Sequence, residues 1–127
     1  MRPDEQPVLY SADLTDCKEV ARLDAGATAR AFAAALCSAG ATIVQESRHE
    51  FAGGGLTCIL ILEESHAVVH TWPETGTVNI DIFSCSTRLR SLAAIAQLGR
   101  FFGAGQVSVR EVLRADGHPA TAARSRA

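Results

Sequence analysis

Three segments in the middle of the chain have strand-like sequences and follow one another across short turns. LTCILILEE (56–64), HAVVHTW (66–72) and TVNIDIFSC (77–85) are rich in β-branched and aromatic residues. The triplet GGG (53–55) precedes the first segment, and the turn sequence PETG (73–76) separates the last two. Strands joined by such short turns pair as antiparallel neighbours. The chain is therefore expected to fold around an antiparallel sheet.

The flanking segments complete the pattern. Further strands are predicted over residues 7–14, 41–51 and 106–113, and Ala- and Leu-rich segments with helical periodicity over residues 18–38 and 89–102. The order β, α, β, β, β, β, α, β predicts an α+β fold. We expect a two-layer sandwich, a mostly antiparallel sheet with both helices on one face.

The segment CILIL (58–62) is apolar at every position, so its strand has hydrophobic side chains on both faces of the sheet. Helices on one face would leave the other face in contact with water. We therefore expect a homodimer in which two sheets stack face to face. The alternative is a monomer whose second face is only moderately apolar.

Length and charge limit the remaining possibilities. The 127 residues fit one domain (1–127), with a small, polar and disordered tail expected at 115–127. The formal charge of −2 gives no basic field for nucleic acid or an anionic membrane. No apolar run is long enough to span a bilayer or to form the core of a signal peptide, so we expect a cytoplasmic location.

The four cysteines are widely spaced and form no C-x-x-C pair, which argues against a zinc knuckle or a thioredoxin-type motif; they are Cys17, Cys37, Cys58 and Cys85. In a reducing compartment we expect four free thiols.

The segment LEESHAVVHTWPE (62–74) concentrates reactive side chains in a chain otherwise dominated by Ala, Leu, Val and Gly. His66 and His70 have the zinc-binding spacing of a helix, but the two valines between them favour a strand, so we expect no metal. Ser65 lacks the G-x-S-x-G turn of a serine hydrolase. A third chemistry, self-cleavage, remains open for this serine.

A serine in a strained turn between two strands can attack the carbonyl of its own preceding peptide bond. At Glu64–Ser65 this N→O acyl shift would give an ester. Removal of the Cα proton of Ser65 and β-elimination would then break the chain, and the resulting dehydroalanine would hydrolyse to a pyruvoyl group. His70 is a candidate for the base because imidazole titrates near neutral pH.

The run ESHAVVHTWPE (64–74), followed by DIFSC (81–85), closely resembles the prokaryotic pyruvoyl-dependent S-adenosylmethionine decarboxylase proenzymes. The hallmark of that family is an ESH-x3-HTWPE strand pair followed by a D-x-F-[ST]-C strand. The resemblance extends from about residue 8 to residue 113 and includes GATIV (40–44).

The resemblance implies self-cleavage at the Glu64–Ser65 bond into chains 1–64 and 65–127. Ser65 matches the residue that becomes the pyruvoyl cofactor and forms a Schiff base with the substrate. His70 matches the proton acceptor in processing, and Cys85 the proton donor in turnover. Thr57 matches a serine whose hydroxyl is implicated in processing. No metal is implied.

The substrate site matches the family less completely. Phe51 matches an aromatic residue that stacks on adenine, and Glu74 matches a carboxylate that holds the ribose hydroxyls. The family usually has Tyr at the positions of Thr75 and Thr77, and Arg is common where this chain has Glu50. The departures fall where substrate should be recognised and leave the processing residues intact.

The implied reaction is decarboxylation of S-adenosylmethionine to the aminopropyl donor for spermidine, with the pyruvoyl ketone drawing the electrons released as CO2 departs. Two alternatives stay open. One is the same chemistry on arginine or ornithine, with Glu50, Glu74 or Asp81 facing the cationic side chain. The other is an unprocessed, non-catalytic interaction protein. The expected partners are a small-molecule substrate and a second copy, as a homodimer or a dimer of processed two-chain protomers, but neither nucleic acid nor membrane.

Overall fold

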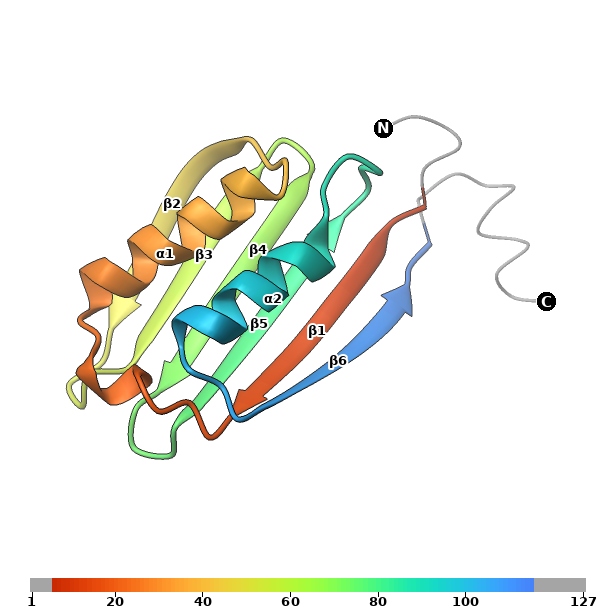
Figure 1. Ribbon diagram of the computed structural model, residues 1–127. Coiled ribbons are helices and arrows are strands. Elements are labelled where there is room, and N and C mark those ends of the chain that lie inside the picture. The colour runs from red at the N-terminus through yellow and green to blue at the C-terminus, as the bar shows by residue number, and fades with distance from the viewer. Residues whose placement is uncertain (1–5, 116–127) are drawn as a thin grey trace.

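The computed structural model describes residues 6–115, which form a six-stranded sheet with two helices packed across one face (Figure 1). All neighbouring strands are antiparallel, and their order across the sheet is β2-β3-β4-β5-β1-β6. The strands are β1 (Val8–Thr15), β2 (Ile43–Glu50), β3 (Leu56–Leu62), β4 (Ser65–Trp72), β5 (Thr77–Ser84) and β6 (Gln106–Leu113). The predicted α+β fold and strand order along the chain are confirmed.

One face of the sheet is buried under the helices. Side chains alternate between the two faces of a strand, and on β5 Val78, Ile80 and Ile82 are completely buried whereas the residues between them are partly exposed. The helices contribute Phe32 and Leu98, which have no exposed surface, to the same core. The apolar positions of the strands and helices thus meet in a single layer.

Helix α1 runs over Ala25–Ser38 and so begins later than the predicted start at Lys18. The side chain of Asp24 accepts a hydrogen bond from the backbone N–H of Ala27 at 2.7 Å, and this N-cap defines where the helix begins. Before the cap, the chain forms only a short 3-10 helix, η1 (Val20–Arg22). The apolar periodicity continues across this segment, but the Asp24 cap separates a 3-10 turn from the α-helix.

Helix α2 spans Ser91–Phe101, inside the predicted range of 89–102. It ends just before Gly103, whose φ of 63° is readily adopted by glycine and ends many helices. The two helices lie side by side over the sheet (Figure 1). None of the helices within residues 6–115 is long and apolar enough to cross a membrane.

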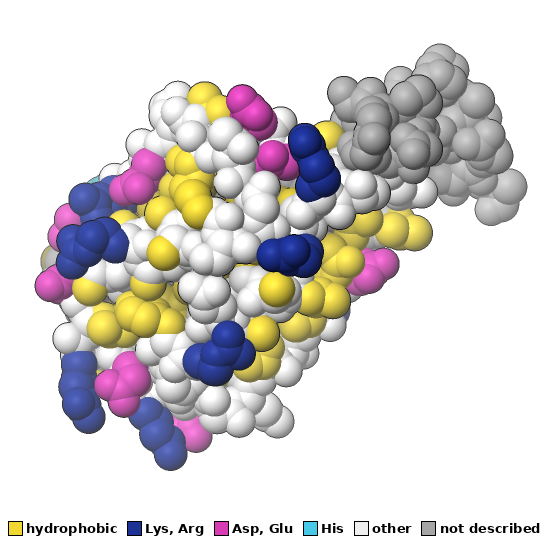
Figure 2. Space-filling view, turned by 45° about the horizontal axis from the view of Figure 1, so that its top comes forward, with side chains coloured by type: hydrophobic (Ala, Val, Ile, Leu, Met, Phe, Trp, Pro, Cys, Tyr) yellow, Lys and Arg dark blue, Asp and Glu magenta, His cyan; other side chains and the backbone are white. Residues whose placement is uncertain are grey.

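The opposite face of the sheet, here called the open face, has no helix over it. Ile59 and Ile61 of β3 project from it and are 40% and 43% exposed. The helices also leave part of edge strand β6 uncovered, so that Val107 and Val109 are exposed on the helix side. Figure 2 shows hydrophobic side chains along one side of the molecule. The open face is the one for which sheet stacking was predicted, and that dimer stays a prediction. The predicted disordered tail, except for Ala115, lies outside the described residues.

Candidate active site

Ser65 occupies the first position of β4, directly after a tight two-residue connection. Leu62 pairs with Ser65 across the β3–β4 hairpin, so Glu63 and Glu64 alone make the turn. The φ angle of Ser65 is 152°, in a region that residues other than glycine rarely occupy. Such backbone strain persists only where surrounding contacts impose it. The predicted strained turn at the Glu64–Ser65 bond is present.

Glu64 is held at both its main chain and its side chain. Its carbonyl oxygen accepts hydrogen bonds from the backbone N–H of Cys85 at 3.2 Å and from the Cys85 thiol at 3.3 Å. Its carboxylate, which is almost completely buried, accepts a hydrogen bond from the backbone N–H of Thr42 at 3.1 Å. Two donors thus converge on the carbonyl of the bond before Ser65, which polarises that carbonyl.

The histidine in contact with the Ser65 hydroxyl is His66, not His70. The Ser65 Oγ and His66 Nδ1 atoms are 3.4 Å apart, and the imidazole also lies against Phe83, with 5.5 Å between ring centroids. From the sequence, His66 was weighed only as a metal ligand. Its adjacency to Ser65 in the sequence was the available signal, but alternation along a strand does not predict contact between neighbours.

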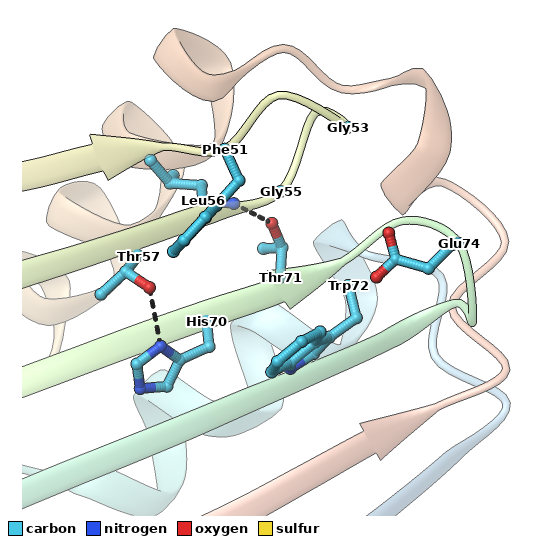
Figure 3. A pocket seen from close by; sticks show the side chains of 9 residues that line it. All are labelled: Phe51, Gly53, Gly55, Leu56, Thr57, His70, Thr71, Trp72 and Glu74. Carbon is cyan, nitrogen blue, oxygen red and sulfur yellow. Dashed lines mark hydrogen bonds between the residues drawn. The ribbon is translucent and has the colours of Figure 1, made fainter.

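A second cluster lies toward the other end of β4. The Thr57 Oγ1 and His70 Nδ1 atoms are 2.9 Å apart across the β3–β4 pair, where the two residues face each other in register. They border a cavity of about 460 Å³, drawn in Figure 3. Its lining consists of Phe51, Gly53, Gly55, Leu56, Thr57, His70, Thr71, Trp72 and Glu74.

The cavity therefore brings together four of the predicted site residues. Figure 3 shows Phe51 from the end of β2, Thr57 from β3, His70 from β4 and Glu74 from the β4–β5 turn around one space. Trp72, to which the sequence analysis gave no role, lies between His70 and Glu74 in the lining. The surface is mostly apolar with a few polar groups, as in typical small-molecule sites.

The two clusters are far apart within one chain. Ser65 and His70 are separated by five residues of extended strand, which corresponds to about 16 Å. Cys85 lies at the Ser65 end, just beyond the last residue of β5. The protomer alone does not join the predicted nucleophile to its predicted base.

The remaining cysteines are distinguished by burial. All four thiols are free; Cys58 is buried in the core and Cys37 is exposed. Burial of Cys58, followed by the nearby charge of Glu46, raises the pKa of its thiol to about 11 although Arg48 opposes the shift. Such a thiol is unreactive near neutral pH. Within residues 6–115, no three His, Cys, Asp or Glu side chains are grouped as they would be around a metal ion.

Comparisons with known proteins identify the family of the chain. A family model described as S-adenosylmethionine decarboxylase matches residues 9–115. The S-adenosylmethionine decarboxylase proenzyme of Acidithiobacillus ferrooxidans is 36% identical over 103 residues, which cover 81% of this chain and 77% of the relative. That of Clostridium tetani is 29% identical over 103 residues, with 81% and 82% covered. The crystal structure of the adenosylmethionine decarboxylase from Aquifex aeolicus has a TM-score of 0.75 with 20% sequence identity, covers 87% of this chain and 91% of its own, and thus has the same fold.

Proposed function

Because the chain belongs to the S-adenosylmethionine decarboxylase family, we propose that it cuts itself at the Glu64–Ser65 bond and then decarboxylates S-adenosylmethionine. The main support for this proposal is the geometry at the Glu64–Ser65 peptide bond. The Glu64 carbonyl oxygen accepts two hydrogen bonds from Cys85, and Ser65 follows it with a φ of 152°. A polarised carbonyl in a strained connection is suited to attack by the adjacent hydroxyl.

In the first step of cleavage, Ser65 Oγ bonds to the carbonyl carbon of Glu64. The C–N bond breaks, the hydroxyl proton is transferred by way of a base to the released amine, and an ester replaces the peptide bond. The Cys85 N–H stabilises the negative charge that the Glu64 oxygen carries in the tetrahedral intermediate. His66 Nδ1, 3.4 Å from Ser65 Oγ, is positioned to relay the proton.

In the second step, His70 of a second copy of the chain removes the Cα proton of Ser65 and the Cβ–Oγ bond breaks. Glu64 leaves as a new chain-terminal carboxylate, and the other chain then begins with dehydroalanine. Water converts this residue to a pyruvoyl group with release of ammonia. The strained serine at the start of a strand fits this origin of the group.

The pyruvoyl ketone, once formed, would condense with the substrate amine with loss of water and would provide the electron sink for the pair left by departing CO2. Cys85 then donates a proton to the substrate carbon. Its thiol is placed for that role because it lies 3.3 Å from the carbonyl oxygen at the cleavage point, from which the new group forms. The same residue thus acts through its N–H in cleavage and through its thiol in turnover.

The substrate lies in the cavity of about 460 Å³, a volume within the usual range for small-molecule sites. Phe51 stacks on the adenine, and the carboxylate of Glu74 accepts hydrogen bonds from the ribose hydroxyls. Both residues line the cavity, and the space is bordered by aromatic rings on the open side of the sheet. The product is decarboxylated S-adenosylmethionine.

A complete site requires a second protomer, because Ser65 and His70 are about 16 Å apart along β4. We propose a homodimer in which the open faces stack around a twofold axis near Val68, the middle of that interval. Stacked sheets lie about 10 Å apart, so Ser65 of one protomer then faces the partner's His70. The exposed Ile59 and Ile61 supply apolar surface for the interface.

Two measurements test the proposal. The purified wild type should run on a denaturing gel as two small chains, one carrying a carbonyl at its N-terminus by intact mass, whereas Ser65→Ala should run as one. The processed protein should release CO2 from labelled S-adenosylmethionine faster than from labelled arginine or ornithine. Faster turnover of either amino acid would transfer the assignment to that substrate, and an uncut wild type would favour a non-catalytic scaffold.

A further inference from the structure

A chain of hydrogen bonds crosses the open face of the sheet and ends at the cavity. The indole N–H of Trp72 on β4 donates to Asn79 Oδ1 on β5 at 2.6 Å. Asn79 Nδ2 then donates to Asp13 Oδ1 on β1 at 2.8 Å. Asp13 and Asn79 are direct cross-strand partners, and Trp72 is diagonal to Asn79 in the next pair. Three neighbouring strands therefore fix one side chain.

The chemistry of the end groups allows only one orientation of the amide. The indole N–H is only a donor, so it requires the Asn79 oxygen. The carboxylate of Asp13 is only an acceptor, so it requires the Asn79 nitrogen. A reversed amide would place two donors together at Trp72 and two acceptors together at Asp13. The carboxylate therefore determines the direction of the amide, and the amide determines the position of the indole.

Trp72 gains from such support because about half of its surface is in contact with solvent. Its side chain is 49% exposed, yet it forms part of the cavity wall together with Phe51. The residue opposite it on β5 is Thr77, which offers no aromatic surface for the indole to pack against. An exposed aromatic ring without neighbouring contacts samples several rotamers. The hydrogen bond that the indole N–H donates to Asn79 Oδ1 selects one of them.

We propose that Asp13 and Asn79 are positioning residues that hold Trp72 as a wall of the substrate cavity, so that substrate recognition depends on a carboxylate two strands away. This inference rests on the proposed function, because the cavity is taken as the substrate site. Neither Asp13 nor Asn79 lines the cavity; Asn79 acts through Trp72, and Asp13 acts through Asn79.

Arg110 of β6 provides a matched control at the outer end of the network. Its guanidinium lies 4.0 Å from Asp13 Oδ2, and both side chains are largely exposed. Pairs of this kind contribute little in water. Removal of Arg110 leaves intact both the hydrogen bond from Trp72 to Asn79 and the one from Asn79 to Asp13, so Arg110→Ala should behave as wild type.

The first test uses fluorescence, since Trp72 is the only tryptophan in the chain. Time-resolved anisotropy is measured on uncleaved protein in the Ser65→Ala background, which needs neither processing nor substrate. Asn79→Leu and Asp13→Leu should add a fast depolarisation component that the parent and Arg110→Ala lack. Asp13→Asn keeps an acceptor oxygen and should restore the slow decay. Identical decays in all variants would overturn the positioning role.

The second test measures decarboxylation of S-adenosylmethionine by the processed variants. Asn79→Leu and Asp13→Leu should raise KM about tenfold while kcat stays within about twofold, as expected when a contact made equally before and during reaction is lost. A mobile indole with unchanged KM would overturn the role in recognition. Analytical ultracentrifugation of each variant must give the wild-type assembly, because these residues lie on the open face.

The experiments distinguish failure of the proposed function from failure of the positioning role of Asp13 and Asn79. If the wild type does not turn over S-adenosylmethionine, the proposed function fails and the recognition role fails with it. The anisotropy result on uncleaved protein would still decide whether Asp13 and Asn79 hold the indole.

Discussion

The backbone N–H of Cys85 donates a hydrogen bond to the carbonyl oxygen of Glu64 at 3.2 Å, and the thiol of the same residue lies 3.3 Å from that oxygen. Cys85 thereby offers two chemically separable groups to one atom. The N–H survives any substitution except proline, whereas the thiol is lost in every substitution. Mutation of this residue can therefore separate chain cleavage from turnover.

Cys85→Ala should still cut itself, because it retains the donor that polarises the Glu64 carbonyl. Turnover should fall by about 100-fold or more, the usual contribution of a positioned proton donor. Cleavage is followed on a denaturing gel and turnover by release of labelled CO2. Cys37→Ala, at an exposed thiol, is the control and should match wild type in both assays. Undiminished CO2 release from Cys85→Ala would remove the thiol from its proposed role.

The Thr57 hydroxyl should matter for the rate of cleavage because it lies 2.9 Å from His70 Nδ1 and orients that ring. Thr57→Val removes the hydrogen bond at nearly constant volume, and we expect cleavage to slow by about 10- to 100-fold. Thr57→Ser keeps the hydroxyl and should cut at close to the wild-type rate. The time course of precursor loss after denaturation and refolding gives both rates. Cleavage of Thr57→Val at the wild-type rate would argue against a role for the hydroxyl.

The two-protomer site predicts complementation between inactive chains. Ser65→Ala alone and His70→Ala alone should both remain uncut. In a mixed dimer, however, Ser65 of the His70→Ala chain faces an intact His70 from the Ser65→Ala chain. Coexpression with two different affinity tags should therefore give cleavage of the His70→Ala chain only.

Tagged mixed dimers that stay uncut would show that each chain depends on its own His70. A Val68→Asp variant, which places a charge near the proposed twofold axis, should in turn weaken both the dimer and cleavage in an otherwise wild-type chain. Sedimentation and gel assays on the same samples relate the two effects.

Because of Cys58, the free energy of unfolding should depend on pH in the alkaline range. Its pKa rises from an ordinary 9.0 to about 11 in the folded protein, so the folded state favours the protonated thiol. This contribution is fully present below pH 9 and is lost as the pH rises through 11. The free energy of unfolding of wild type relative to Cys58→Ala should therefore decline over that interval. Urea titrations at pH 8, 9, 10 and 11 measure the difference, and a constant difference would contradict a buried, protonated thiol.

The strands could be predicted well from sequence because local signals and tertiary demands agree. A glycine triplet precedes β3, and a turn with proline and glycine separates β4 from β5. The apolar residues of these strands alternate or run continuously, as a covered sheet requires. The start of α1 could not be predicted as well, since Ala- and Leu-rich residues continue on both sides of the actual boundary. A single side-chain bond from Asp24 decides it.

For the candidate site, too, some features could be predicted from the sequence and others could not. The reactive residues were identified by resemblance to a family motif, which is a property of residue types in order. Their contacts depend on strand pairing between distant parts of the chain. Asn79 meets Asp13 across 66 positions, and Glu64 meets Cys85 only because β4 and β5 pair in register. For that reason Cys85 could be identified from the sequence, but the hydrogen bond from its N–H to Glu64 could not. The place of Trp72 in the cavity wall, and its connection to Asn79 and Asp13, could not be predicted either.

The backbone of Ser65, at a φ of 152°, is kept in place by contacts that include a residue 20 positions further along the chain. A nascent polypeptide that has just emerged from the ribosome lacks those contacts, so its hydroxyl has no aligned carbonyl to attack. In the proposed mechanism, synthesis must pass Cys85, and β5 must have joined the sheet, before cleavage at Glu64–Ser65 can begin. The proposed cut would therefore come only after the two resulting fragments are held together by paired strands.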